Sequence, residues 1–456
     1  MRFSELLNSY IEKSDMTKNS MINVLNIDRS TFFQILNGRR LPTNKQLMDI
    51  VENIDVATVE RRRLIDAYER ETLGEDMYQA QKFVQNSLDI IYESDYKEKD
   101  ISISVKTSGE KDDKTHVTGK SSVKKYLRQL IIDELTTGGS IDIFTPISLM
   151  VEMDLFQILS LMCSSEEAHN TPIRQLVEFP VRNIFTNSES ISVLGLYLEF
   201  LLNQNLDYHA YYYYADSILS TRMGVFYPYY MIFSNRVILL NVDGDELIDI
   251  SDTDINNAWR ANFEEILNSA DSLVSSFDKK EEYVALLGQR GNKTLYIFEK
   301  RPGISFMMTK EFMDKYIPKP MHEMIYAHVN CFIQSDYVEI ISSAGAEAFF
   351  ADKCIDEAGF KLQAEEQDVM FVKEWMKERL HKTLEILDAE KMPLSDNWSI
   401  SVIEDECLIL VPYLSNDKII YVSEKNIVKA FTNFAKNISS EEVLLDDEKT
   451  TQLLKN

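Results

Sequence analysis

The stretch that decides the fold of the N-terminal part is Thr17-Lys-Asn-Ser-Met-Ile-Asn-Val-Leu-Asn-Ile-Asp-Arg-Ser-Thr-Phe-Phe-Gln-Ile-Leu-Asn-Gly-Arg-Arg-Leu-Pro42. It holds two apolar faces with helical spacing, one within residues 21–25 and one within residues 32–36. Asn26 stands between them, where a tight turn favours a residue that tolerates the left-handed conformation. The stretch therefore predicts two short helices that pack against each other and against neighbouring elements.

The second of these helices carries side chains suited to reading base pairs. Asp28 or Ser30 can cap its first turn. The outward positions near its start hold Arg29, Ser30, Thr31 and Gln34. Arginine bonds bidentately to guanine, glutamine bonds to adenine, and a threonine methyl group can touch the methyl group of thymine. These residues favour a helix that lies in the DNA major groove.

The end of the same helix is equally informative. Gly38 after Asn37 supplies a left-handed C-cap, and Pro42 prevents the helix from continuing. Arg39 and Arg40 follow at the point where phosphates would pass. The pattern as a whole resembles the lambda-repressor and Cro (XRE-type) helix-turn-helix regulators, over roughly residues 3–56.

This resemblance implies an all-α five-helix domain with its first helix at Phe3–Lys13 and its fourth at Asn44–Asn53, while Val59–Glu71 forms the fifth helix or a connector. Lys18 stands where the family usually has a phosphate-contacting glutamine, and Ile22 where it usually has a small alanine. The expected DNA-contacting residues are Lys18, Arg29, Ser30, Thr31, Gln34, Asn37, Arg39 and Arg40. A small helical bundle that binds another protein is the alternative.

Length and charge limit the domain number and the partners of the rest of the chain. At 456 residues the chain is long enough for two or three domains. Residues 1–70 carry 11 basic and 10 acidic side chains, a net charge of +1, so the remaining residues carry −27 of the total −26. Such an acidic body repels phosphate, which leaves DNA selectivity to a small basic surface and argues against a nuclease that grips DNA along its whole length.

Several function classes lack their motifs. The four cysteines are far apart, which indicates free thiols in a reducing cytosol: Cys163, Cys331, Cys354 and Cys407. No phosphate-binding loop, nucleophile elbow or histidine pair with metal-ligand spacing occurs. No apolar signal region or membrane span is evident either. We therefore expect a cytoplasmic protein that is not an enzyme, with no catalytic residue, no metal site and no cofactor.

The organisation we expect is multidomain: an all-α helix-turn-helix domain followed by a bilobal α/β domain, for which one repeated corner suggests a duplication. The predicted divisions are residues 1–57 for the DNA-binding domain, 58–117 for a helical connector and linker, 118–278 for a first sensor lobe and 279–456 for a second. A short β-like stretch, Ile101–Val105, lies in the linker. Helical and strand-like runs alternate after Gly119, which favours layered α/β lobes.

One strand-to-helix corner of the chain occurs twice and suggests a duplication. Residues 251–259 align without gaps with residues 423–431, each after a pair of β-rich runs. Each copy predicts a strand, a serine helix cap and an amphipathic helix whose aromatic residue packs on the sheet. Two such lobes related by a pseudo-twofold axis would leave a ligand cleft between them. This picture resembles the phospholipase-D-like domains that some regulators use as sensors, but neither lobe has the His-x-Lys motif of the catalytic members.

Tyrosines cluster in the first lobe, at residues 208–214 and 227–230. Cross-strand aromatic pairs in a sheet account for this cluster better than a ligand-stacking wall. If a ligand does bind there, the candidate residues are Tyr212, Tyr214 and Tyr227.

The function predicted from the sequence is a sequence-specific transcriptional regulator, dimeric on a palindromic DNA site, whose body senses a small molecule or a protein. Recognition helices about 34 Å apart would read the two half-sites of such a palindrome. Two alternatives stay open. The body could be a nuclease-like effector that the DNA module addresses, as in phage defence, or a scaffold that binds another protein through its acidic surface.

Overall fold

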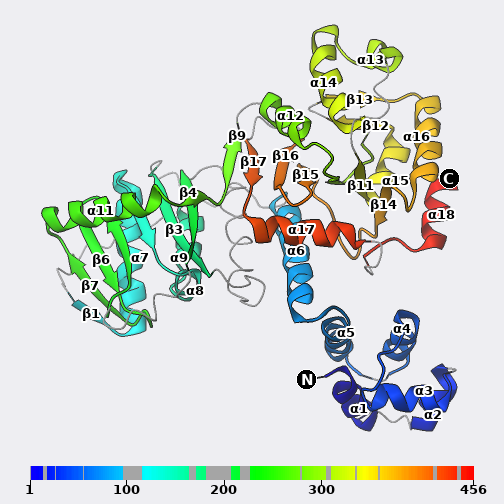
Figure 1. The fold of residues 1–456 in the computed structure, drawn as a ribbon, viewed down its shortest axis with the longest axis horizontal. Helices are drawn as coiled ribbons and strands as arrows, with labels where there is room; N and C mark the ends of the chain where they lie inside the picture. Colours follow the sequence, from blue (N-terminus) through cyan, green and yellow to red (C-terminus); the bar gives the residue numbers. More distant parts are fainter. Residues whose placement is uncertain are drawn as a thin grey trace. The chain divides into compact units, whose positions relative to one another are not determined.

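The computed structural model describes residues 2–13, 18–25, 27–54, 56–95, 116–163, 171–180, 207–215, 226–277, 280–303, 310–333, 336–357, 360–413, 418–438 and 443–455. The chain forms two compact units, Met1–Lys82 and Phe83–Asn456. The first is helical and the second is a mixed α/β part with two large sheets (Figure 1). Asn26, the linker stretch Ile101–Val105 and residues 191–203, whose sequence predicts a helix, lie outside the described residues.

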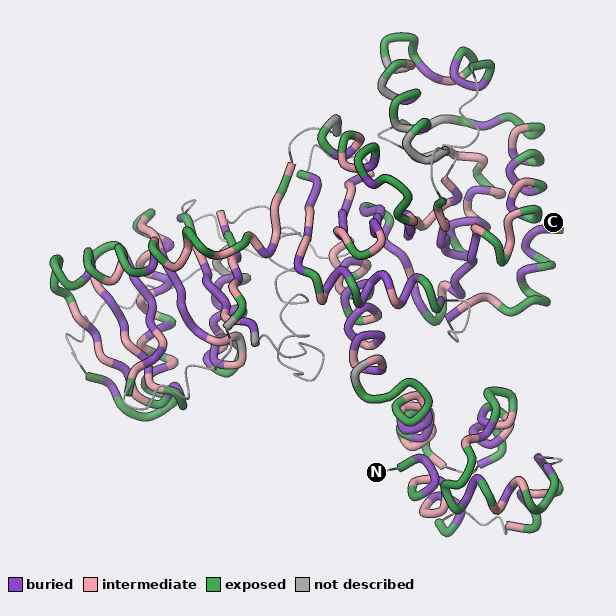
Figure 2. The backbone as a smooth tube through the Cα atoms, viewed as in Figure 1, coloured by how far each residue is buried: buried purple, intermediate pink, exposed green. Residues whose placement is uncertain are grey.

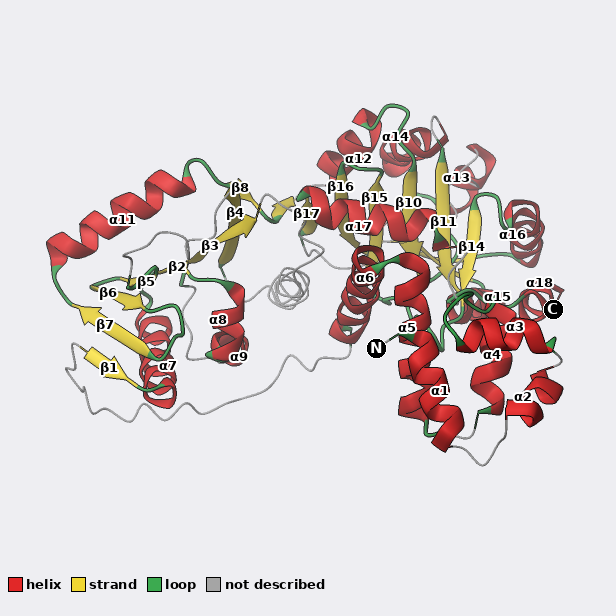
Figure 3. Cartoon of the chain, turned by 60° about the horizontal axis from the view of Figure 1, so that its bottom comes forward, coloured by secondary structure: helices red, strands yellow, loops and turns green. Residues whose placement is uncertain are grey.

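The first unit packs five helices around one apolar core (Figure 3). They are α1 (Phe3–Lys13), α2 (Lys18–Leu25), α3 (Arg29–Leu36), α4 (Asn44–Asn53) and α5 (Thr58–Leu73). The first and fourth helices have the bounds that the sequence predicts. The α-helix α6 (Glu75–Ser94) follows after Gly74, which has φ +81° and ends α5.

The fifth helix is part of this core and not only a connector. Leu64, Ala67 and Tyr68 of α5 are buried in it. The Tyr68 hydroxyl donates to the Pro42 carbonyl oxygen at 3.1 Å and to Asn44 Oδ1 at 2.8 Å, so α5 holds the connection between α3 and α4. The first unit therefore extends to Lys82, past the division at residue 57 that the sequence suggested.

The second unit begins at Phe83 within α6, and its first lobe is built on an eight-stranded sheet of order β1-β7-β6-β5-β2-β3-β4-β8. Its elements are β1 (His116–Thr118), α7 (Lys120–Thr137), β2 (Ile141–Phe144), α8 (Ile147–Glu152), α9 (Leu155–Cys163), β3 (Ile173–Pro180), β4 (Tyr208–Ala215), β5 (Tyr229–Phe233), β6 (Arg236–Leu240), β7 (Glu246–Ile250), α11 (Thr253–Leu267) and β8 (Asp271–Ser272). The strands β2, β3 and β4 are parallel, and β5 is antiparallel to β2. The α11 helix covers one face of the sheet, while α7 and α9 lie on the other (Figures 1 and 3). Its central strands are buried, as Figure 2 shows.

The second lobe has a seven-stranded sheet of order β14-β11-β10-β15-β16-β17-β9 and a separate β12–β13 hairpin. Its elements are β9 (Ser275–Phe277), α12 (Lys280–Gln289), β10 (Leu295–Glu299), α13 (Lys310–Tyr316), the 3₁₀ helix η4 (Lys319–Met321), α14 (His322–Ile333), β11 (Tyr337–Ser342), α15 (Ser343–Asp352), β12 (Cys354–Glu357), β13 (Phe360–Gln363), α16 (Glu366–Arg379), β14 (Leu384–Leu387), β15 (Trp398–Ile403), β16 (Cys407–Pro412), β17 (Ile419–Val422), α17 (Lys425–Lys436) and α18 (Asp447–Lys455). Because β9 belongs to this sheet, the lobe starts a few residues before position 279.

The two lobes share one topology. Read from β9, the second sheet has the order β9-β17-β16-β15-β10-β11-β14, which matches β1-β7-β6-β5-β2-β3-β4 in strand order and in direction. The second lobe also has a counterpart of β8, the eighth strand of the first sheet. Residues 443–445 run antiparallel to β14, with Leu445 N–H donating to the Ile386 carbonyl at 2.9 Å, as β8 runs antiparallel to β4. The repeat suggested by one corner of the sequence thus extends over the whole sheet.

The corner itself is built in the same way in both lobes. Asp252 accepts hydrogen bonds from the backbone N–H groups of Asp254 and Ile255 at the start of α11. Glu424 does the same for Asn426 and Ile427 at the start of α17. The acidic residue after each serine is the cap, so the serine caps that the sequence analysis assigned are wrong.

The contact between the lobes joins elements that are not equivalent. The Tyr214 hydroxyl on β4 donates to the Glu424 carboxylate, which follows β17. In the shared topology the counterpart of β4 is β14, and the counterpart of β17 is β7. A twofold axis would repeat this contact between the counterparts, so Asp252 would have to meet β14 as Glu424 meets β4. Asp252 is exposed whereas Glu424 is buried. The two caps therefore do not make equivalent contacts, and the pseudo-twofold arrangement expected from the sequence is not supported.

Candidate nucleic-acid interface

The N-terminus of α3 is capped by a side chain. Asp28 caps it, and its Oδ1 accepts a hydrogen bond from the Thr31 backbone N–H at 2.9 Å. Hydrogen bonds from the side chain and backbone of Thr31 lower the pKa of the Asp28 carboxyl group, with a smaller contribution from the charge of Arg40. Of the two caps that the sequence allowed, Asp28 is the one that the structure uses.

The end of α3 is equally well defined. Gly38 has φ +66° and its N–H donates to the Ile35 carbonyl at 3.0 Å, while the Arg39 N–H donates to the Gln34 carbonyl at 2.9 Å. This pair of bonds is the Schellman arrangement, which satisfies the last carbonyls of a helix. A Cβ atom at Gly38 would lie 2.9 Å from Ser4 Oγ, so glycine is needed for space as well as for conformation.

Most of the residues expected to contact DNA are exposed and lie around α3. The exposed ones are Arg29, Ser30, Gln34, Asn37, Arg39 and Arg40. Their arrangement follows from helical geometry, because Phe32, Ile35 and Leu36 are buried and leave the opposite face outward. The structure thus places Arg29, Ser30, Gln34 and Asn37 on the outward side of α3, and the exposed Arg39 and Arg40 follow its end.

Lys18 and Thr31 are placed differently. Lys18 is the first residue of α2 and is partly buried. Thr31 is also partly buried, and its side chain hydrogen-bonds to Asp28, so its hydroxyl group supports the helix cap. Ile22 is partly buried and packs against the core of the first unit.

Sequence reasoning missed Phe33, which lies on the same helix between Arg29 and Gln34. Its ring is partly buried at the edge of the core, and its centroid is 6.3 Å from that of Phe32. The guanidinium carbon of Arg29 lies 5.8 Å from the Phe33 centroid. The residue could have been found from its spacing, because position 33 is one helical turn after position 29.

A side chain of α1 also holds the end of α3, which the sequence did not reveal. Asn8 of α1 donates from Nδ2 to the Leu36 carbonyl at 2.7 Å and to the Ser4 carbonyl at 2.8 Å. The bond to Leu36 satisfies a carbonyl in the last turn of α3, where helices lack internal donors. The α1 helix therefore orients the candidate recognition helix directly.

The candidate ligand residues of the body do not form one cluster. Tyr212 and Tyr214 lie on β4 with ring centroids 5.6 Å apart, and burial raises the pKa of Tyr212 to about 12. Tyr227 instead interacts with Glu246 on β7, several strands away in the sheet order. The Tyr214 hydroxyl is occupied by Glu424. The favoured interpretation, aromatic pairs within a sheet, fits these contacts.

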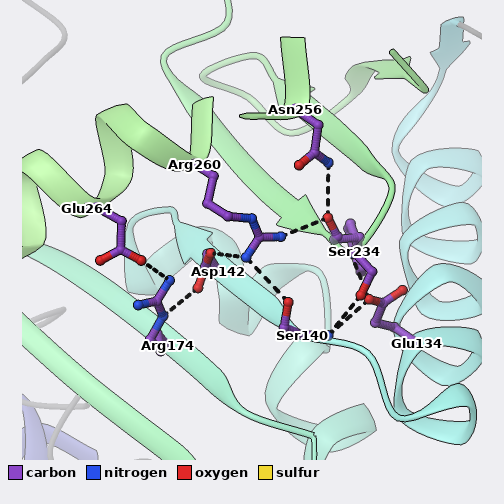
Figure 4. Close-up of polar contacts among 9 residues, drawn as sticks. Glu134, Ser140, Asp142, Arg174, Ser234, Asn256, Arg260 and Glu264 are labelled. Atoms are coloured by element: carbon purple, nitrogen blue, oxygen red, sulfur yellow. Dashed lines mark hydrogen bonds and ion pairs between the residues drawn. The ribbon is translucent and has the colours of Figure 1, made fainter. Parts of the chain in front are cut away.

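The body also holds a buried polar network that the sequence analysis did not predict (Figure 4). The Asp142 side chain is 1% exposed and receives Nε of Arg174 at 2.7 Å and Nη1 of Arg260 at 3.0 Å. Arg174 also pairs with Glu264 at 2.7 Å, and Arg260 donates to the Phe233 carbonyl at 3.1 Å. These contacts attach α11 to the sheet. An aspartate inside the apolar run Ile141–Phe144 was the sequence signal.

Comparisons with known proteins identify no family for the chain. No protein-family model and no curated protein matches it. Among solved structures, TrmBL2, an archaeal chromatin protein described as showing a novel mode of DNA binding, aligns at 9% identity and a TM-score of 0.21, covering 58% of this chain and 91% of that one. A likeness of this size carries no argument about fold or function.

Two further findings concern the described part of the chain only. None of its helices is long and apolar enough to cross a membrane. Its histidine, cysteine, aspartate and glutamate side chains form no group of three or more that could hold a metal ion.

Proposed function

We propose that the first unit is a helix-turn-helix module that binds double-stranded DNA in a sequence-specific manner, with α3 as its recognition helix. The observation that carries the proposal is the exposed polar surface of α3, where Arg29, Ser30 and Gln34 stand near a rigidly capped N-terminus. Arginine and glutamine are the side chains that read guanine and adenine in the major groove. A recognition helix contacts base edges mainly with its N-terminal residues.

The basic residues around α3 fit a role in holding the DNA backbone. Arg39 and Arg40 follow the helix and are exposed, and Lys45 is exposed near the start of α4. Such contacts set the register of the protein on DNA but do not read sequence. The acidic second unit would repel phosphate and so keep DNA binding local to the first unit.

The test is selection of bound sequences from random double-stranded DNA by the full-length protein. The variant Arg29→Ala/Gln34→Ala should lose at least about 30-fold in affinity for the selected site, because each bidentate base contact is worth about 1–3 kcal/mol. Arg62→Ala is the matched control, since it removes the same charge from an exposed position on α5. Equal selection by wild type and double variant would refute the assignment and favour a protein-binding helical bundle.

For the complete chain we propose a transcriptional regulator that acts as a dimer on a palindromic site, with the two-lobed body as its sensor and without enzymatic activity. Helix-turn-helix dimers read half-sites about 34 Å apart, so a palindrome in the selected sequences would support the dimer. An effector would have to bind two arrangements of the body with different affinity in order to change DNA binding. The body repeats one topology, and repeated lobes provide surfaces between which such a ligand can bind.

A further inference from the structure

We infer that Phe33 is a specificity residue of the DNA interface, which reads the methyl group of a thymine next to the guanine read by Arg29. This inference rests on the proposed function of the first unit. It assigns the apolar part of the readout to Phe33 in place of Thr31, which the sequence had suggested.

Phe33 lies among the side chains of α3 that are proposed to contact bases. With 3.6 residues per turn, Arg29 and Phe33 stand one above the other on α3, and Gln34 lies beside Phe33. The neighbouring Phe32 points into the core and is fully buried, whereas Phe33 is only partly buried. The ring therefore keeps an apolar edge on the surface that carries the base-reading side chains.

The ring of Phe33 has the charged group of Arg29 as a neighbour. The Arg29 guanidinium carbon lies 5.8 Å from the Phe33 centroid, within the range of a cation–π interaction. An arginine held against a ring has fewer orientations to lose when it binds guanine. The ring then offers its remaining edge to an apolar group, and the thymine methyl is the apolar group of the major groove.

Thr31, the residue that the sequence suggested for the thymine methyl group, has another role in the structure. Thr31 is partly buried, and its side chain hydrogen-bonds to the capping residue Asp28. It also lies on a different side of α3, about 160° around the helix axis from Phe33 at about 100° per residue. Thr31 therefore supports the start of the helix, while Phe33 lies beside the side chains that are proposed to contact bases.

The geometry also limits where the thymine lies. One helical turn rises about 5.4 Å, and successive base pairs are about 3.4 Å apart. If α3 runs along the groove, the base pairs that face Arg29 and Phe33 are at most about two steps apart. The thymine should therefore lie within about two base pairs of the guanine at which Arg29→Ala relaxes specificity.

The experiment removes the methyl group from the DNA, so it does not depend on a protein variant that folds. Duplexes of the selected site carry deoxyuridine in place of each thymine in turn, and the full-length protein is titrated against each by fluorescence anisotropy. At one thymine in each half-site we expect uracil to weaken binding about fourfold, the effect of burying one methyl group. The same measurement follows with Phe33→Ala, and with Thr31→Ser, which keeps the hydroxyl group but lacks the methyl.

Phe33→Ala should bind the thymine and uracil duplexes equally, and Thr31→Ser should keep the fourfold preference. The inference is overturned if wild type binds all uracil duplexes as tightly as thymine, if Phe33→Ala keeps the preference, or if Thr31→Ser abolishes it. If the protein selects no sequence at all, the proposed function fails and this inference with it. A site that depends on Arg29 and Gln34 but not on any methyl group refutes the Phe33 assignment alone.

Discussion

The Tyr214 hydroxyl on β4 donates a hydrogen bond to the Glu424 carboxylate that caps α17, and Asn426 Nδ2 donates to the same hydroxyl at 3.2 Å. Burial and the neighbouring carboxylate raise the pKa of Tyr214, so the hydroxyl stays protonated as the donor. This contact links the two lobes of the body through side chains. It also uses a carboxylate that has no exposed surface in the structure.

Removing that hydroxyl should loosen the lobes from each other. We expect Tyr214→Phe to lower the free energy of unfolding by about 1–2 kcal/mol, because a hydrogen bond to a charged group is lost and Tyr214 is partly exposed. Tyr213→Phe is the matched control, since its hydroxyl donates to Glu178 at 3.0 Å inside the first lobe. Limited proteolysis at low urea should separate the lobes in Tyr214→Phe earlier than in Tyr213→Phe. Identical cleavage would show that the contact does not hold the lobes together.

The two helix caps should differ in their value for stability, although their geometry is the same. Asp252→Ala removes an exposed cap and should cost about 1 kcal/mol. Glu424→Ala removes a buried cap that also serves Tyr214 and Asn426, and should cost about 2–3 kcal/mol. Urea unfolding at neutral pH measures both. Equal losses would mean that burial of Glu424 adds nothing to its role as a cap.

The network under α11 should depend on its central carboxylate. Asp142→Asn keeps the volume but leaves Arg174 and Arg260 without their shared counter-charge, and we expect a loss of about 2–4 kcal/mol. Glu264→Gln affects a carboxylate that is 44% exposed and should cost less than about 1 kcal/mol. Thermal unfolding of both variants tests this order. A larger effect of Glu264→Gln would contradict it.

Replacing Gly38 should lower the stability of the protein for two reasons, backbone conformation and lack of space. Gly38→Ala forces a side chain into φ +66° and places Cβ 2.9 Å from Ser4 Oγ, which together should cost about 1–3 kcal/mol. In the background Ser4→Ala the oxygen is absent, so the same substitution should cost only the conformational part, about 1–2 kcal/mol. Comparing the destabilisation by Gly38→Ala in the wild-type and Ser4→Ala backgrounds, from thermal melting curves, separates the steric contribution from the conformational one. No difference between backgrounds would show that the Ser4 contact relaxes freely.

Stability should change with pH through Glu339, whose carboxylate pairs with Arg379 at 2.9 Å and accepts from the Gly303 N–H at 2.6 Å. Burial nevertheless raises the pKa of Glu339 above its ordinary value of 4.5. The folded state then holds the proton more tightly than the unfolded state. This contribution to stability is fully present below pH 4.5 and is lost as the pH rises through the raised pKa of the folded protein.

The check is the free energy of unfolding at a series of pH values between 4.5 and 8 for wild type and Glu339→Gln. Glutamine does not titrate, so the difference between the two proteins should shift in favour of the variant as the pH rises. A constant difference would mean that Glu339 titrates normally in the folded protein.

Local sequence signals determined much of the secondary structure. Helix bounds such as Phe3–Lys13 and Asn44–Asn53 were predictable because apolar periodicity and turn residues act over a few positions. The same local chemistry gave the Asp28 cap and the left-handed Gly38. It misassigned the caps of α11 and α17, because a serine followed by an acid offers two capping residues and only backbone geometry selects one.

Only the tertiary structure decided which of these elements act together. It placed α5 in the core of the first unit, extended a repeat seen at one corner to a complete sheet topology, and separated Tyr227 from Tyr212. These relations join residues far apart in the chain, and periodicity carries no information about which distant elements pair. Sequence by itself determined where the helices of the first unit form and that Arg29, Ser30 and Gln34 face outward on α3. Packing decided that Phe33 shares that surface with Arg29 and that Tyr214 meets Glu424, because such contacts depend on how whole elements lie against one another.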